Sequence, residues 1–523
     1  MVISFKLTYS TMFNPPEEMH TRFDTAVART RAALGARHKL YISGQDVDGA
    51  GAIDKTSPID GALLGHFATA DTGQVTAAVA AAKRAFPAWR ATPVAERVRL
   101  AQRVAALLDE RVYDIAAALC LEVGKNRLEG LAEVAEAADF FRGYADDFAR
   151  NSGYDRVLPD DPLTDFRSHN RSVLKPHGVW VVVSPFNFPM ALAAGPVAAA
   201  LVTGNTVVAK GASDTPWAVR LLADCVRDAG YPPGVFNFVA GGGATVGEAL
   251  VSHPDVAGIT FTGSHEVGMA LARRMVTGAY TRPCITEMGG KNAVIVTAAA
   301  DLERAATGIV RSAFGLSGQK CSATSRVYVA DEVADALCAK LVANTHAIRI
   351  GDPTVREHWL GPVISTGAVA KYLRYASELG GGGGRILTGG KRLTEGALGS
   401  GCFVAPTVAE APHEHPLFAI EMFLPIVMIG RVDGLEEGVA RANDSPLGLT
   451  AGFYGSPAES RYFLDQIEAG TVYVNRPQGA TTGAWPWYQA FGGWKGSAST
   501  GKAIGSFYYL PQYLREQSQT VVE

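Results

Sequence analysis

Residues 178–210 read GVWVVVSPFNFPMALAAGPVAAALVTGNTVVAK and carry no charged side chain before Lys210. A helix that spans a membrane needs about 20 unbroken apolar residues, whereas Pro185 and Pro189 interrupt this run. The pattern instead predicts a strand at 179–183, a tight turn, a buried helix near 190–202 and a second strand at 206–210. We therefore expect a β-α-β unit here and no insertion into a membrane.

The same alternation of short apolar strands and helices continues beyond this unit. Further strands are expected at 235–239 and 258–262, and residues 76–150 have the i, i+3, i+4 spacing of amphipathic helices. A second series follows Glu287, with strands at 293–296 and 326–329 and a helix at 302–314. Buried strands joined by helices form parallel sheets covered on both faces, so the chain is predicted to be an α/β protein.

The composition is typical of a large folded protein of the cytoplasm. At roughly 150 residues per domain, 523 residues predict about three domains. Hydrophobic residues make up 47% and charged residues 19%, which argues against disorder. The net charge of −3 gives no global basic field, so we expect no nucleic-acid partner. Six cysteines without a CxxC pair, and an amino terminus without a signal-peptide apolar core, predict a reduced cytoplasmic setting.

Two residues are candidates for chemistry, although each also has an ordinary explanation. Cys321 lies in GQKCSA and Glu287 in TEMGGKN. A free cysteine is often a small buried hydrophobe, but the neighbouring ammonium of Lys320 would favour a nucleophilic thiolate. A glutamate that follows a strand is often simply exposed. Neither residue identifies a reaction by itself.

The glycine-rich residues 241–247, GGGATVG, follow an expected strand. A dinucleotide-binding turn has the spacing G-x-G-x-x-G, which no reading frame of this loop provides. A glycine-rich turn that enters a helix can still direct backbone N–H groups toward a phosphate. The loop is therefore either a phosphate-binding turn or a tight connection between strand and helix.

Seven motifs occur in an order that resembles the NAD(P)-dependent aldehyde dehydrogenase superfamily. They are SPFNFP around Asn187, VVAK ending at Lys210, FTGS ending at Ser264, EMGGKN from Glu287, GQKC ending at Cys321, EMF from Glu421 and FGGWKGS from Phe491. The resemblance runs from about Tyr41 to Val522. It implies an α/β, aldehyde dehydrogenase-like fold with three units. These are a Rossmann-like cofactor domain at 1–150 and 177–287, an α/β catalytic domain at 288–501, and a small β oligomerisation arm at 151–176 and 502–523.

The resemblance also implies a reaction, which the chemistry of aldehydes makes plausible. An aldehyde is a poor hydride donor until a thiolate adds to its carbonyl and forms a tetrahedral thiohemiacetal. By resemblance Cys321 is this nucleophile, and the Asn187 amide and Cys321 N–H stabilise the developing oxyanion. Glu287 matches the base that activates water to hydrolyse the resulting thioester. Its presence argues against the branch of the family that transfers the acyl group to CoA.

For the cofactor, the resemblance implies NAD or NADP held by residues at several strand ends. Lys210 is assigned to the adenosine ribose, Ser264 to the pyrophosphate and Glu421 to the nicotinamide ribose. Further cofactor contacts are assigned to Phe186, Ser213, Gly263 and Phe423. NAD-preferring relatives often carry a carboxylate at the position of Ser213, which would repel a 2′-phosphate. We therefore expect at least some use of NADP.

The substrate is the least constrained part of the prediction. Four segments resemble the 1-pyrroline-5-carboxylate (glutamate γ-semialdehyde) dehydrogenase branch: residues 122–127 with Glu133 and Glu136 downstream, 318–326, 481–484 and the tail 508–517. By that resemblance Ser322, Gly483 and Ala484 hold the substrate carboxylate, and Phe188 packs along its chain. The rings of Trp485, Trp487 and Tyr488 depart from that branch. They would either line a site for another aliphatic or aromatic aldehyde or pack at a subunit contact.

Three further expectations complete the prediction. His413-Glu414-His415 lacks a third ligand at a suitable spacing, so we expect a solvated loop and no metal site. A catalytically silent scaffold is the remote alternative, because such proteins usually lose a chemical residue and this chain retains Asn187, Glu287 and Cys321. The unpaired strands of the arm would aggregate unless a partner covered them, which predicts a homodimer or higher homo-oligomer.

Overall fold

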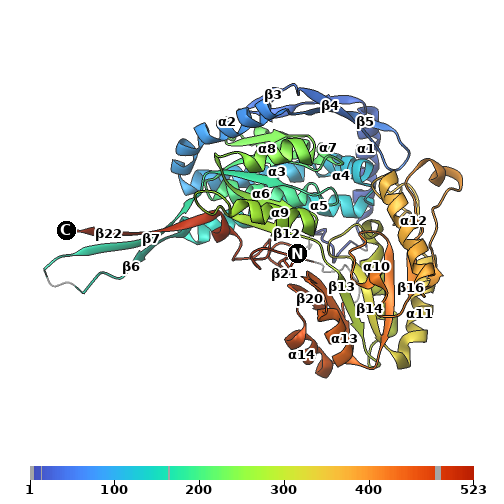
Figure 1. Ribbon diagram of the computed structural model, residues 1–523. Coiled ribbons are helices and arrows are strands. Elements are labelled where there is room, and N and C mark those ends of the chain that lie inside the picture. Colours follow the sequence, from blue (N-terminus) through green and yellow to red (C-terminus); the bar gives the residue numbers. More distant parts are fainter. Residues whose placement is uncertain (1–4, 13, 163–164, 477–483) are drawn as a thin grey trace.

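Two seven-stranded sheets, each covered by helices, form the body of the molecule (Figure 1). The computed structural model describes residues 5–12, 14–162, 165–476 and 484–523. The first sheet has the order β12-β11-β8-β9-β10-β2-β3 and is parallel except at its β2 and β3 edge. Its strands are β2 (Leu40–Ile42), β3 (Gln45–Val47), β8 (Val179–Val183), β9 (Thr206–Lys210), β10 (Phe236–Val239), β11 (Val256–Thr262) and β12 (Cys284–Glu287). Its helices are α2 (Thr72–Ala91), α3 (Val94–Glu110), α4 (Val112–Val123), α5 (Arg127–Arg150), α6 (Ala191–Val202), α7 (Pro216–Asp228), α8 (Glu248–Ser252) and α9 (His265–Met275).

The β-α-β unit expected at residues 179–210 is confirmed. β8 and β9 occupy the predicted residues and pair in parallel, and α6 connects them. The β-branched residues of β8 suit a pleated strand, and α6 is apolar on all sides because both of its faces are covered. Parallel strands end at the same edge of a sheet, so the turn after β8 and the residues after β9 lie on one side.

The second sheet has the order β15-β16-β17-β14-β13-β19-β20 and is parallel except for its edge strand β15. Its strands are β13 (Asn292–Val296), β14 (Thr324–Ala330), β15 (Arg385–Thr388), β16 (Thr407–Glu410), β17 (Ile426–Val432), β19 (Thr450–Tyr454) and β20 (Thr471–Val474). Its helices are α10 (Leu302–Phe314), α11 (Asp331–His346), α12 (Thr366–Gly381), α13 (Leu435–Asn443) and α14 (Pro457–Gln466). The helix predicted at 302–314 is therefore confirmed, as is the α/β class of the whole chain.

A three-stranded sheet projects from the body as a separate arm (Figure 1). It consists of β6 (Asp155–Leu158), β7 (Ser168–Pro176) and the carboxyl-terminal strand β22 (Leu514–Val522). β22 pairs antiparallel with β7 along all nine residues of each strand. The two sequence segments expected in the arm thus pair with each other, although they lie more than 300 residues apart.

The smaller elements complete the chain. One three-stranded sheet contains β1 (Ala36–His38), β4 (Gly51–Thr56) and β5 (Leu63–Thr69), and β18 (Leu447–Gly448) pairs with β21 (Trp494–Lys495). Among the described residues, every helix is too short or too polar to span a bilayer. All six cysteines are free.

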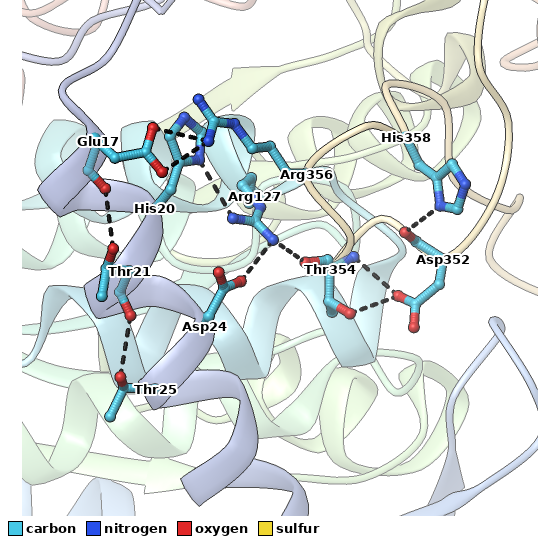
Figure 2. A network of polar contacts seen from close by, with 10 residues as sticks. All are labelled: Glu17, His20, Thr21, Asp24, Thr25, Arg127, Asp352, Thr354, Arg356 and His358. Carbon is cyan, nitrogen blue, oxygen red and sulfur yellow. Dashed lines mark hydrogen bonds and ion pairs between the residues drawn. The ribbon is translucent and has the colours of Figure 1, made fainter.

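The amino-terminal helix α1 (Glu17–Ala32) is anchored by a polar network (Figure 2). Arg127, the first residue of α5, donates to the carboxylate of Asp24 at 2.7 Å and to the carbonyl oxygen of Thr354. Arg356 binds the carboxylate of Glu17 at 2.8 Å. The network therefore joins α1 to α5 and to a loop that follows α11, and so connects the helices of both sheets.

Candidate active site

Cys321 lies in the short segment between η3 (Gly315–Gly318) and β14. The residues before it have unusual backbone angles: Leu316 and Ser317 have φ values of 50° and 52°, and Gly318 has 67°. Side chains rarely adopt this left-handed region, and such strain persists where the surrounding structure enforces it. The chain thus reaches the thiol through a tightly specified bend.

Asn292, the first residue of β13, holds the same segment from the other side. Its side-chain amide donates to the carbonyl oxygens of Cys321 at 2.7 Å and Ala323 at 2.9 Å. Its Oδ1 accepts the N–H of Thr450 at 3.0 Å, so the second sheet holds the amide itself in place. A Cβ at Gly290 would lie 3.0 Å from the Cys321 carbonyl oxygen, so a side chain there would crowd the segment.

The surroundings of Cys321 favour the neutral form of its thiol. Burial raises its pKa to about 12, and the charges of Glu421 and Glu287 act in the same direction. The expectation that Lys320 favours a thiolate is wrong, because its ammonium is paired with Glu129 at 2.6 Å. Cys321 must therefore transfer its proton to a base before it can act as a nucleophile.

Glu287 is the last residue of β12, at the carboxyl edge of the first sheet. Its side chain is buried, and Oε2 has no hydrogen-bond partner in the described part of the chain. Burial raises the pKa of Glu287 well above its usual value, although an N–H of Gly493 partly opposes this shift. When it is ionised, a buried carboxylate with one unpartnered oxygen is suited to accept a proton from a nearby thiol or water.

Asn187 lies in the buried turn between β8 and α6. This turn is held by Glu133 of α5, whose Oε1 accepts the N–H groups of Met190 at 2.9 Å and Ala191 at 3.2 Å. The carboxylate of Glu133 also lies 2.7 Å from the ammonium of Lys125, and both side chains are fully buried. A buried ion pair thus holds the start of α6 and the residues that precede it.

Several residues expected to bind the cofactor lie at the carboxyl edge of the first sheet. Lys210 ends β9 and donates to the carbonyl oxygen of Gly211 at 2.9 Å, and burial lowers its pKa to about 8. Ser264 is the N-cap of α9, where free N–H groups favour a phosphate. The N–H of Gly263 donates to the carbonyl oxygen of Glu287 at 3.1 Å. A nucleotide at this edge would therefore lie beside Glu287.

Glu421 and Phe423 approach from the second sheet. Glu421 accepts the N–H of Gly290 at 3.1 Å, and burial raises its pKa to about 7. A Cβ at Gly289 would come within 2.0 Å of the Glu421 carboxylate, so only glycine permits this approach. The ring of Phe423 lies edge-to-face on Phe186, with centroids 5.7 Å apart, and thus meets the turn after β8.

These groups fit a dinucleotide. They comprise an ammonium, a helix N-terminus and a carboxylate, which are suited to ribose hydroxyls, a pyrophosphate and a second ribose respectively. Ser213 also lies here, but its hydroxyl donates to the carbonyl oxygen of Gly241 at 3.1 Å and so joins the glycine-rich turn. Residues 243–247 of that turn form one turn of π-helix, η2 (Gly243–Gly247), that leads into α8.

The residues expected to bind the substrate are only partly described. The half-buried ring of Phe188 has the ammonium of Lys125 3.3 Å above its centroid. Ser322 is half-buried beside Cys321, and Ala484 is buried. Gly483 lies outside the described residues, as do Thr481 and Thr482.

The three rings that depart from the expected pattern turn toward α5 or solvent. Trp485 is buried and its Nε1 donates to Asp139 at 2.7 Å. A Cβ at Gly143 would overlap the indole nitrogen of Trp487, so glycine admits that ring against the helix. Tyr488 is 70% exposed. Two of these rings therefore pack against a helix of their own chain.

No role at the site was predicted from the sequence for three of its neighbours. Lys125 and Glu133 surround the turn that carries Asn187, and Tyr9 contacts both Phe188 and Trp485. The available signal was the spacing of Glu129, Glu133 and Glu136, which places three carboxylates on one face of a helix.

The expectation of a solvated loop at His413 and His415 is wrong for His415. His415 is buried and its Nδ1 accepts the N–H of Leu417 at 3.2 Å, because the imidazole caps a short helical turn. The Nε2 of His413 contacts the carbonyl oxygen of Arg431 at 2.6 Å. Within the described ranges, no group of three or more His, Cys, Asp or Glu side chains is arranged to hold a metal ion.

Comparison with known proteins gives consistent results for sequence and structure. The profile of the aldehyde dehydrogenase family matches residues 45–518. The 1-pyrroline-5-carboxylate dehydrogenase of Geobacillus thermodenitrificans (strain NG80-2) is 36% identical over 510 residues, which cover 96% of each chain. The protein of the same name from Bacillus subtilis (strain 168) is 34% identical over 514 residues, again 96% of each chain.

Among solved structures, 1-pyrroline-5-carboxylate dehydrogenase from Thermus with bound NAD is similar over the full length of both chains, with a TM-score of 0.91 and 34% identity. Proline utilization A from Bdellovibrio bacteriovorus has a TM-score of 0.90 and 34% identity. That match covers 96% of this chain and 51% of the larger protein.

Proposed function

This chain belongs to the aldehyde dehydrogenase family, and we propose that it oxidises L-glutamate γ-semialdehyde to glutamate with NAD or NADP as hydride acceptor. The observation that carries the proposal is that the half-buried thiol of Cys321 lies within electrostatic reach of Glu287, whose Oε2 has no hydrogen-bond partner in the described part of the chain. The names of full-length relatives support the choice of aldehyde.

The first chemical step is addition of Cys321 to the aldehyde. In its ionised form Glu287 accepts the thiol proton, because burial raises the pKa of this carboxyl group and its Oε2 has no other hydrogen-bond partner in the described part of the chain. The sulfur then bonds to the carbonyl carbon, and the carbonyl π electrons move to oxygen. The Asn187 amide and the Cys321 N–H stabilise this oxyanion, and one such donor typically contributes about 2.7–4 kcal/mol.

NAD or NADP, which Lys210, Ser264 and Glu421 would hold, would supply the acceptor for a hydride from the thiohemiacetal carbon. The oxyanion collapses to a carbonyl, so Cys321 is left as a thioester. Glu287, after its proton has passed to solvent, takes a proton from water as that water attacks the thioester carbon. The carbon–sulfur bond breaks, the carboxylate is released and the Cys321 thiolate is reprotonated. The enzyme is therefore a non-acylating dehydrogenase.

The proposed binding site for the substrate surrounds Phe188. Its ring would pack along the aliphatic chain, while the hydroxyl of Ser322 and N–H groups near Ala484 and Gly483 would bind the far carboxylate. Remote binding of this kind positions the aldehyde over Cys321 and so increases the rate. Ser213 supplies no carboxylate to repel a 2′-phosphate, which supports use of NADP as well as NAD.

The arm supports the further proposal of a homodimer or higher homo-oligomer. β6 is an edge strand whose Val157 is 82% exposed, and Val521 of β22 is 57% exposed. Apolar side chains on an open edge strand are usually covered by a partner. Static light scattering at micromolar concentration is expected to give at least twice the 55.2 kDa chain mass. A monomer would contradict the proposal.

We also propose the cytoplasm as the location, which the six free cysteines support. The proposed domains remain 1–150 with 177–287, 288–501, and the arm at 151–176 with 502–523. Limited proteolysis would test these boundaries by cleavage near residues 150, 177 and 287.

A spectrophotometric screen for reduced cofactor tests the substrate. It compares 1-pyrroline-5-carboxylate, succinate semialdehyde, hexanal and benzaldehyde, each with NAD and NADP, and uses Cys321→Ala as the control for background reduction. We expect the highest kcat/KM for 1-pyrroline-5-carboxylate and measurable turnover with NADP. A higher kcat/KM for hexanal or benzaldehyde would reject the proposed substrate in favour of another aliphatic or aromatic aldehyde.

A further inference from the structure

The amino-terminal segment at residues 5–12 packs against α5. Leu7 and Thr8 are buried, and the ammonium of Lys6 lies 2.7 Å from the carboxylate of Asp139. The hydroxyl of Tyr9 donates to Oε2 of Glu136 at 2.8 Å. A few residues later the chain enters α1, which the network around Arg127 holds in place (Figure 2). The segment is thus bound to α5 by its own contacts and continues into an anchored helix.

Tyr9 touches two segments that carry proposed substrate contacts. Its ring lies edge-on to Phe188, with centroids 6.2 Å apart, and edge-on to Trp485 at 5.4 Å. Phe188 directly follows Asn187, and Trp485 directly follows Ala484. A single side chain from the amino terminus therefore bridges the turn after β8 and the segment after β20.

The partner of Tyr9 belongs to a row of carboxylates on α5. Glu129, Glu133 and Glu136 are spaced i, i+4 and i+7, and so lie on one face of the helix. Glu129 pairs with Lys320, the residue before Cys321, and Glu133 holds the start of α6. Glu136 holds Tyr9. One face of α5 thus contacts three segments around the proposed site: the segment that carries Cys321, the turn that carries Asn187 and the amino-terminal segment.

We propose that Tyr9 is a specificity-determining residue and that residues 5–12 form a wall of the aldehyde site. The inference rests on the proposed function, because it assumes that the substrate packs along Phe188. The Tyr9 ring limits the space beside Phe188, while its hydroxyl keeps a hydrogen-bonded polar group at that wall. This wall favours a short aldehyde with a polar far end over a longer apolar one.

Removal of the ring and removal of the hydroxyl have separable effects. Tyr9→Ala opens a cavity between Phe188 and Trp485, into which an apolar chain can extend. Tyr9→Phe keeps the ring but leaves Glu136 without its hydroxyl donor. Tyr9→Ala therefore changes the size of aldehyde that the site can accept, and Tyr9→Phe changes mainly the polarity of the wall.

The test measures kcat and KM for 1-pyrroline-5-carboxylate, succinate semialdehyde, hexanal and benzaldehyde in wild type, Tyr9→Ala and Tyr9→Phe. Tyr280→Ala is the matched control, because that tyrosine is 70% exposed and outside the site. In Tyr9→Ala, we expect the ratio of kcat/KM for hexanal to that for 1-pyrroline-5-carboxylate to rise about tenfold or more. That change corresponds to about 1.4 kcal/mol. In Tyr9→Phe, we expect a smaller rise, carried mainly by a higher KM for the polar aldehydes.

An equal fall for every aldehyde, or unchanged ratios in both variants, would overturn the proposal and leave Tyr9 with a structural role. If Tyr9→Ala does not fold, Tyr9→Phe and Tyr9→Leu keep the test decisive, since both retain a large apolar side chain. Failure of the proposed function is distinguishable, because wild type itself would then not prefer 1-pyrroline-5-carboxylate. The effect of Tyr9 on the ranking of aldehydes can be measured in either case.

Discussion

The residues proposed to react with the aldehyde and the aromatic residues proposed to select it are held in place by different parts of the chain. Glu287 ends a strand of the first sheet, and Asn292 of the second sheet holds the segment that carries Cys321. Tyr9, by contrast, packs on both Phe188 and Trp485, and the side chains of Tyr9 and Trp485 each donate to a carboxylate of α5. The reacting groups thus lie at or next to the ends of sheet strands, whereas the proposed selectivity for the aldehyde depends on aromatic side chains packed beside α5.

This comparison predicts two kinds of mutant. A change in the residues proposed to react with the aldehyde should stop or slow the reaction for every aldehyde. A change in the wall should alter stability or the ranking of aldehydes while the chemistry continues. The following variants are ordered from the largest expected effect to the smallest.

Replacement of the thiol has the largest expected effect. Cys321→Ala should give no reduced cofactor, even as a single-turnover burst, because hydride transfer requires the covalent thiohemiacetal. Stopped-flow absorbance with enzyme in excess of aldehyde is the measurement. Cys284→Ala is a matched control, since that cysteine is also partly buried but begins β12 away from its carboxyl end. A burst in Cys321→Ala would show that another group carries the reaction.

Loss of the base should separate the two halves of the reaction. Glu287→Gln is expected to collapse steady turnover while a burst of reduced cofactor remains when the reaction is started at high pH. There the thiol ionises without Glu287. The shape of the side chain is retained, so a loss of both phases at every pH would point to misfolding or to a role in hydride transfer alone.

The raised pKa of Glu287 also predicts a pH dependence for the wild type. The base form is the ionised one, and burial raises the pKa, so turnover should fall as pH decreases through that raised value. An ordinary glutamate, with a pKa near 4.3, would remain ionised well below neutrality. When the pH is lowered from 9 to 5, the steady-state rate should therefore begin to fall before pH 5 is reached. A flat profile down to pH 5 would contradict the assignment.

Removal of the oxyanion donor should have a smaller effect than removal of the thiol. Asn187→Ala is expected to lower kcat about 10²–10³-fold for every aldehyde in the panel, because it removes one hydrogen bond that strengthens in the transition state. KM should change little, and circular dichroism should confirm that the overall fold is retained. A loss of kcat confined to one aldehyde would indicate that Asn187 selects the substrate and does not stabilise the oxyanion.

The smallest effect on the chemistry is expected for a change in α5 at Gly143, which contacts Trp487. Gly143→Ala places a methyl group against the indole of Trp487 and should destabilise the fold by about 1–3 kcal/mol. Thermal unfolding measures the loss, and Gly380→Ala, where a Cβ meets nothing within 4 Å, is the control. The kcat of folded Gly143→Ala should remain close to that of the wild type. A severe loss of kcat would show that the wall and the reacting residues are coupled.

The parts of the molecule that the sequence predicted well are those in which one residue pattern determines one structure. β8, β9 and α10 occupy the expected residues, because buried parallel strands appear as continuous apolar runs and helices follow the 3.6-residue period. The apolar run 206–210 also placed Lys210 at the end of a strand, whereas β12, which ends at Glu287, was not among the expected strands.

The contacts around the site were less predictable, because they depend on packing between distant segments. Tyr9 and Glu136 are 127 residues apart, and no local pattern links them. Proximity in sequence predicts that Lys320 stabilises a Cys321 thiolate, yet Lys320 pairs with Glu129 at a separation of 191 residues. The contact between Trp487 and Gly143 forms only when α5 packs against the carboxyl-terminal segment.

The central claim is that Cys321 forms a covalent acyl intermediate that Glu287 clears. The most direct test is mass spectrometry of acid-quenched, digested Glu287→Gln enzyme after reaction with 1-pyrroline-5-carboxylate and NAD at high pH. The account predicts that the peptide containing Cys321 gains the mass of the aldehyde less two hydrogens, as a thioester requires. An unmodified Cys321 peptide in a sample that has produced one equivalent of reduced cofactor would contradict it.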